Sequence, residues 1–166
     1  MRIALYLLAC LAGAVLGLLG DEPGVVLALF AVLLFPVAVI LLATGDGDDR
    51  GRPGAPPLGP ALLAGVAGTL LVVFLIRLAA AAPDWVDPLS ADCGGPSTGA
   101  QQLATWFATI AFALSALPVA ESLVAIGGRL HRRGPLTALP LSLSFYPVAV
   151  AVSGIALIVA SWATSC

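Results

Sequence analysis

Residues 24–44 read GVVLALFAVLLFPVAVILLAT, a run without a single charged side chain. A helix rises ~1.5 Å per residue, so about 20 residues cross the ~30 Å hydrocarbon core of a bilayer. The run is apolar on every face, whereas a helix on a soluble core keeps a polar side. This stretch therefore predicts a transmembrane helix.

Four further apolar runs of similar character occupy residues 3–20, 60–82, 101–127 and 136–164. Each run is near or above the length that a membrane helix needs. A membrane barrel would instead show ~10-residue segments of alternating polarity. The chain is therefore predicted to be an all-α membrane protein, in which about five transmembrane helices form one domain over residues 1–166.

The composition supports a bilayer as the solvent. Hydrophobic residues make up 60% of the chain and charged residues 10%, against roughly 25% charged in average soluble domains. The net charge of −2 is too small to indicate nucleic acid as a partner. Every basic residue other than the lone histidine is arginine, and alanine, glycine and proline are abundant, which favours a bacterial, GC-rich source.

Charge placement predicts the orientation, because arginines near span ends mark the cytoplasmic side and tryptophans gather at interfaces. With five spans, loops 45–59 and 128–135 lie on the side of the N-terminus, and loop 83–100 lies on the other. The first side carries Arg2, Arg50, Arg52, Arg129, Arg132 and Arg133. The second side carries Asp21, Glu22, Asp84, Asp87 and Asp92, with Trp85, Trp106 and Trp162 at the outer span ends. We expect a multi-pass protein of the bacterial cytoplasmic membrane, N-terminus inside and C-terminus outside.

The first run has an alternative interpretation as a secretory signal peptide. It begins after Arg2 and contains small residues, but Leu18 occupies the −3 position before Asp21, where a cleavage site needs a small residue. A retained span is the favoured interpretation. Cleavage would leave four spans without changing the sidedness of the others.

Glu121 is the main candidate for an intramembrane proton or cation site, with Ser115, Pro118 and Ser122 beside it in the fourth run. A carboxylate inside a membrane span indicates a functional site, because burying its charge in lipid is costly. Pro118 frees a backbone carbonyl one turn earlier, and a serine hydroxyl can bind such a group. The alternative is that the helix tilts and Glu121 reaches the cytoplasmic interface.

Arg77 lies about one turn from the outer end of the third run. We expect a structural anchor whose stem extends outward to Asp84 or Asp87. Glu121 is not expected as its partner, because the two residues lie on opposite sides of the membrane midplane.

Small residues at four-residue spacing predict close helix packing. Gly13 and Gly17 form a GxxxG in the first run, and Gly65 and Gly68 each follow an alanine by four positions in the third. Packing within one chain, dimerisation and chance spacing in an alanine- and glycine-rich chain all explain the pattern.

Cys93 and Cys166 both fall on the outer side, where an oxidising exterior permits a disulfide between them. Cys10, inside the first run, is expected to be an inert small hydrophobe. His131 is the only histidine and lacks a partner for metal binding or nucleophilic work. We expect no metal and no cofactor.

Three function classes follow. The first is a non-enzymatic membrane protein acting through helix packing, as an accessory, regulatory or self-associating component. The alternative is a small oligomeric transporter or channel that uses Glu121. The third is a membrane enzyme, for which only the exterior Asp84, Asp87 and Asp92 are available. The expected partners are the lipid bilayer and either the chain itself or a larger membrane complex.

Overall fold

The computed structural model describes residues 2–18, 22–44, 57–86, 99–132 and 139–164. It contains the helices α1 (Arg2–Leu18), α2 (Glu22–Thr44), α3 (Leu58–Val86), α4 (Gly99–Arg132) and α5 (Leu139–Thr164). Within those ranges there is no strand, so the prediction of an all-α chain with five helices is confirmed. Three segments are long and apolar enough to cross a membrane: Val25–Thr44, Leu58–Ala82 and Gln102–His131. The segments Arg2–Leu18 and Ser144–Val159 are apolar and shorter.

The fourth helix extends beyond its predicted end at Gly127. It continues to Arg132, so most of the basic stretch expected as a loop forms its last turn. Glycine inside a helix costs only ~1 kcal/mol relative to alanine, which is too little to end a helix of this length. Gly127 and Gly128 therefore weaken α4 without terminating it.

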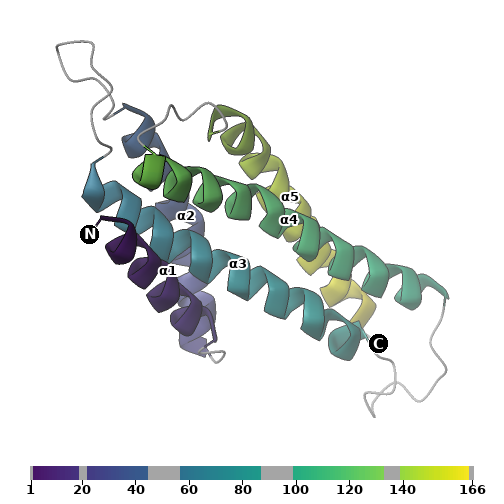
Figure 1. Cartoon of the computed structure of the whole chain (residues 1–166). Coiled ribbons are helices and arrows are strands. Elements are labelled where there is room, and N and C mark those ends of the chain that lie inside the picture. The colour runs from purple at the N-terminus through teal and green to yellow at the C-terminus, as the bar shows by residue number, and fades with distance from the viewer. Residues whose placement is uncertain (1, 19–21, 45–56, 87–98, 133–138, 165–166) are drawn as a thin grey trace.

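Helix α3 lies at the centre of the bundle and contacts all four other helices (Figure 1). Helix α4 runs beside it, α1 and α2 pack on its N-terminal half, and α5 packs mainly on α4. Successive helices run in opposite directions, so the start of α1 and the end of α5 lie at opposite ends of the bundle. We call the end that holds Arg2 and Arg129 the arginine end, and the opposite end the distal end.

The central position of α3 depends on its small side chains, since its buried face is rich in alanine and glycine. A Cβ atom added at Gly68 would come within 2.7 Å of Phe35 in α2 and 2.9 Å of Leu123 in α4. A Cβ atom at Gly65 would lie 3.1 Å from the Tyr6 ring of α1. The two glycines therefore leave the space that large side chains of three neighbouring helices occupy.

Helix α1 approaches α3 most closely along Gly13 and Gly17. A Cβ atom added at Gly13 would overlap the backbone carbonyl oxygen of Val66. At Gly17 it would lie 2.9 Å from Cβ of Val73 and 3.0 Å from the carbonyl oxygen of Leu70. The GxxxG pair is thus used for helix packing inside the chain.

This contact makes a direct prediction for Gly13→Ala. Alanine is the better helix former by ~1 kcal/mol, so the substitution would stabilise α1 if only propensity mattered. Because the added methyl group overlaps the Val66 carbonyl, we expect a loss of about 1–3 kcal/mol instead. Thermal unfolding in detergent measures the change.

Gly128→Ala is the matched control, since a Cβ atom there has nothing within 4 Å. We expect this variant to be neutral or slightly stabilised. Equal stabilisation of both variants would contradict the close α1–α3 contact.

Candidate functional site

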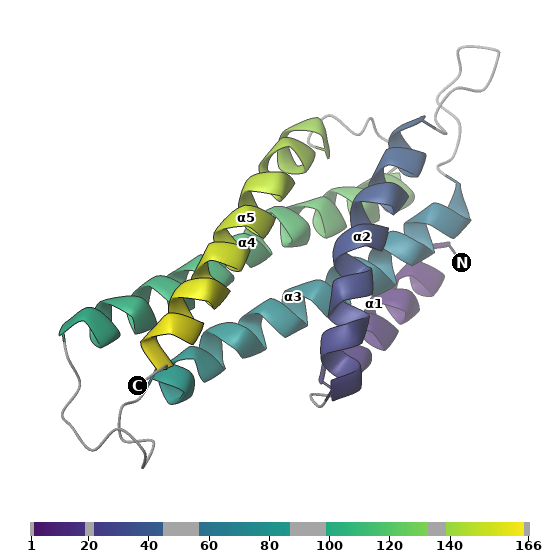
Figure 2. The same cartoon turned by 180° about the vertical axis from the view of Figure 1, so that it is seen from behind.

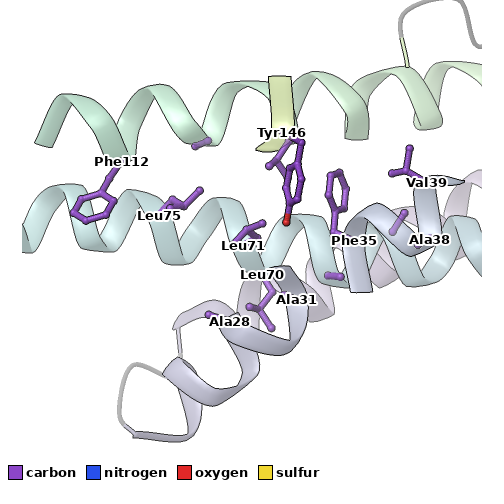
Figure 3. Close-up of a cluster of buried hydrophobic side chains, with 14 of the residues drawn as sticks. Ala28, Ala31, Phe35, Ala38, Val39, Leu70, Leu71, Leu75, Phe112 and Tyr146 are labelled. Carbon is purple, nitrogen blue, oxygen red and sulfur yellow. The ribbon is translucent and has the colours of Figure 1, made fainter. Parts of the chain in front are cut away.

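Pro36 lies inside α2 and leaves one backbone carbonyl without its helical donor. Proline has no N–H group, so the carbonyl of Val32, one turn earlier, loses its intrahelical hydrogen bond. The hydroxyl of Tyr146 in α5 donates to that Val32 oxygen at 2.7 Å. The Tyr146 ring also packs on Phe35, with ring centroids 5.6 Å apart and planes tilted by 47° (Figure 3). We call this arrangement the α2–α5 bridge.

Beyond the bridge, α2 and α5 diverge on the same side of α3 (Figure 2). A cleft of about 550 Å³ lies between them, with walls from α2, α3 and α5 and a smaller contribution from α4. This volume is within the ~300–1,000 Å³ of typical small-molecule sites. The lining is mainly aliphatic and includes Val25 and Leu29 of α2, Leu75 and Leu78 of α3, and Val150 and Leu157 of α5.

Among the residues that the structure describes, four line the cleft with polar side chains: Arg77, Ser115, Tyr146 and Ser153. Tyr146 is engaged in the bridge, and the Ser115 hydroxyl donates to the carbonyl oxygen of Ala149 at 3.1 Å, joining α4 to α5. The Ser153 hydroxyl oxygen is buried and has no hydrogen-bond partner in the part of the chain that the structure describes. Buried polar groups usually have one, so this hydroxyl lacks the acceptor that its burial calls for.

Arg77 caps the end of α1. Its Nη1 group donates to the carbonyl oxygens of Gly17 at 3.1 Å and Leu18 at 3.2 Å. The last four carbonyls of a helix have no intrahelical N–H partner, and a cation there also interacts favourably with the helix dipole. Sequence reasoning missed this partner because the end of one helix is far from Arg77 along the chain.

The expected partners of Arg77 were Asp84 and Asp87. The side chain of Asp84 and the whole of Asp87 lie outside what the structure describes, so that pairing stays a prediction. The observed capping does not need it, because the α1 carbonyls already bind the guanidinium group.

The four residues predicted for an ion or proton site lie on two sides of α4. Ser115 and Ser122 are buried, and the Ser122 hydroxyl donates to the carbonyl oxygen of Pro118 at 2.8 Å within the same helix. Glu121 is exposed and faces away from the other helices, on a surface that also presents Leu117 and Val124. The structure therefore does not bring Glu121 and the two serines together within one chain.

The remaining predicted residues fall partly outside the described ranges. Trp106 is exposed on α4, Arg129 is buried near the arginine end of α4, and Cys10 is a half-buried free thiol. The disulfide predicted between Cys93 and Cys166 and several topology anchors cannot be compared with the structure and stay predictions. The described residues do not include Arg50, Arg52, Cys93, Arg133, Cys166 or the side chains of Trp85, Arg132 and Trp162.

Among the described residues, no three His, Cys, Asp or Glu side chains come together in a metal-binding group. Comparison with known proteins adds no relative: no family model, curated protein or solved structure matches the chain.

The α2–α5 bridge predicts an energetic coupling between Tyr146 and Pro36. Tyr146→Phe leaves the Val32 carbonyl unsatisfied, which we expect to cost about 1–3 kcal/mol. Pro36→Ala restores an N–H donor inside α2, so Tyr146→Phe should cost clearly less in that background. Unfolding of the four variants of this double-mutant cycle in detergent measures the coupling.

Tyr6→Phe provides the control. The Tyr6 hydroxyl donates to the carbonyl oxygen of Leu123 at 2.8 Å, at a position with no proline one turn later. Its cost should be the same in the unaltered chain and in the Pro36→Ala background. The explanation of the bridge is wrong if Tyr146→Phe also costs the same in both backgrounds.

Proposed function

We propose that this chain is a multi-pass protein of the bacterial cytoplasmic membrane that acts without enzymatic chemistry, through contacts between its helices and those of other subunits. Its role would be that of an accessory, regulatory or self-associating membrane component. The observation that carries this proposal is the exposure of Glu121 on an apolar, outward-facing surface of α4.

The apolar exterior supports the membrane location. Large hydrophobic side chains are exposed on all five helices, among them Leu7, Leu33, Ile76, Leu114 and Val148. Monomeric soluble proteins rarely expose contiguous apolar patches beyond a few hundred Å². A bilayer removes that cost, because its hydrocarbon is as apolar as these side chains.

The placement of the arginines supports five spans with the N-terminus inside. Arg2 and Arg129 lie at the arginine end, where arginines mark the cytoplasmic side. Helix α1 is the shortest, and its 17 residues extend ~26 Å, close to the ~30 Å of a hydrocarbon core. Arg77 binds the terminal carbonyls of α1, which supports a retained first span whose end is satisfied by the protein itself.

Glu121 supports a role in helix contacts. It lies eight residues before Arg129 along α4, or ~12 Å by the helical rise. Its neighbours on the surface are apolar, with Leu117 54% and Val124 76% exposed. A carboxylate facing lipid costs about 2.5–3.5 kcal/mol at mid-membrane and less towards the interface. A neighbouring helix that offers a hydrogen bond or a counter-charge lowers this cost. The lower cost favours the binding of a partner helix to this surface of α4.

The second candidate is a small oligomeric transporter or channel. Because Glu121 faces out of the bundle, a carboxylate-lined pathway needs further copies of the chain around it. The same exposed carboxylate therefore favours an oligomer in this case, and the transport of protons or cations would depend on its charge.

The orientation predicts the outcome of reporter fusions. Alkaline phosphatase fused after Cys166 should be active, because it is expected outside. A fluorescent protein fused after Arg52 should fluoresce, because it is expected in the cytoplasm. The reverse pattern would contradict the orientation, and an intact mass lacking residues 1–20 would contradict a retained first span.

The function predicts what purifies with the chain. Affinity purification from native membranes in mild detergent should recover a fixed partner or further copies, and Glu121→Gln should reduce that recovery. Val37→Gln is the control, because it places the same amide on the exposed face of α2. Equal recovery of partners with Glu121→Gln and with the unaltered chain would contradict the proposal. Glu121-dependent cation or proton flux into reconstituted vesicles, with no partner, would favour the transporter.

A further inference from the structure

We infer that the cleft between α2, α3 and α5 is a binding site for one acyl chain of an anionic phospholipid, with the lipid phosphate beside Arg77. The inference rests on the proposed membrane location but not on the role of Glu121. It assigns a ligand to a cavity that the packing of the five helices does not fill.

The length and the lining of the cleft suit an extended hydrocarbon chain. Along α3 the lining runs from Leu71 to Ala81, which is ~15 Å by the helical rise. Over that length the walls are mainly aliphatic, so an apolar chain lying along α3 would contact apolar side chains throughout.

The cleft is closed at one end by the α2–α5 bridge. The bridge lies on the side of the arginine end, and Val32, Leu71 and Tyr146 all line the cleft. Farther along α5, a Cβ atom added at Gly154 would meet nothing within 4 Å. The end of an acyl chain would thus lie against Tyr146, Val32 and Leu71, and the rest would extend towards the distal end.

The positive charge of Arg77 in the lining of the cleft favours a lipid with an anionic headgroup. Arg77 is the one charged residue among the described side chains that line it, and it lies six residues, or ~9 Å, from Leu71 along α3. It is level with Gly17 and Leu18, where α1 ends and where the outer membrane boundary is expected. Guanidinium carries five N–H donors, and the hydrogen bonds to the α1 carbonyls use only those on Nη1. Donors of this kind suit a phosphate group.

Ser153 provides a second polar side chain in the lining of the cleft. It lies seven residues, or ~10.5 Å, beyond Tyr146 along α5, and therefore on the distal side of the α2–α5 bridge, as Arg77 does. Its buried hydroxyl has no partner among the described residues. The ester carbonyl that joins an acyl chain to the glycerol backbone lies close to the phosphate and accepts hydrogen bonds. A lipid bound through Arg77 would place this acceptor near Ser153.

The test uses phosphatidylglycerol with a photoreactive diazirine midway along one acyl chain, incorporated into vesicles with the full-length protein. Labelled peptides are then identified by mass spectrometry. We expect labelling concentrated in residues 25–32, 71–81 and 150–157. Gly154→Leu should reduce it about tenfold, equivalent to ~1.4 kcal/mol, because the leucine side chain fills the cleft.

Gly128→Leu is the matched control, since its added side chain also meets open space but lies at the arginine end of α4. This variant should be labelled by the lipid to the same extent as the unaltered protein. Arg77→Gln should abolish the preference for phosphatidylglycerol over phosphatidylcholine, whereas Arg77→Lys keeps the charge and should retain it. These two variants separate the charge of Arg77 from its capping of α1.

Three outcomes would overturn the inference: equal labelling of Gly154→Leu and Gly128→Leu, uniform labelling around all helices, or disulfide crosslinking of two copies through Val150→Cys. The last would assign the cleft to a second copy of the chain. Carbonate extraction of the same vesicles separates this test from the membrane proposal. A chain released by carbonate is not a membrane protein, whereas a retained chain with uniform labelling contradicts only the lipid site.

Discussion

The close approach of three helices to α3 is the constraint on which the rest of the structure depends. Gly65 and Gly68 leave room for Tyr6, Phe35 and Leu123, and Gly13 brings the backbone of α1 against that of α3. Between helices in lipid, attraction comes from dispersion and hydrogen bonds, because the tails of the lipids are as apolar as the side chains. Removing side-chain bulk from the central helix is what allows enough of these contacts to form.

The polar groups inside the bundle follow a second rule, because they are directed at backbone carbonyls. The hydroxyls of Tyr6, Ser115 and Tyr146 each bind a carbonyl on another helix, and Arg77 binds two at the end of α1. Each bond joins two helices while keeping a polar group away from unpaired burial. Ser153 departs from this rule within the described residues, and it does so in the cleft. The coincidence of an unfilled space and an unsatisfied hydroxyl makes the cleft the most informative feature of the molecule.

Arg77 and Glu121 are both charged residues within long apolar helices, but their surroundings differ. Arg77 turns towards the bundle and is held by the carbonyls of α1. Glu121 turns away from it and has apolar neighbours on the exposed surface of α4. The first side chain has hydrogen-bond partners within the chain, whereas the second has apolar neighbours on α4. The proposed lipid site and the proposed partner surface therefore rest on different residues.

The sequence by itself determined the five helices and their approximate positions, because long apolar runs bounded by charges and prolines leave few other structures. It also identified the small residues of α1 and α3 as packing positions, since a missing side chain is visible in the sequence. Only the tertiary structure decided which atoms meet. Pro36 marks a freed carbonyl at Val32, but nothing in the sequence says that Tyr146, on another helix, binds it. Likewise, the rotation of α4 about its axis decides that Ser115 and Ser122 face inward and Glu121 outward. That rotation depends on packing against α3 and α5, because α4 is apolar on nearly all sides and its own pattern selects no buried face.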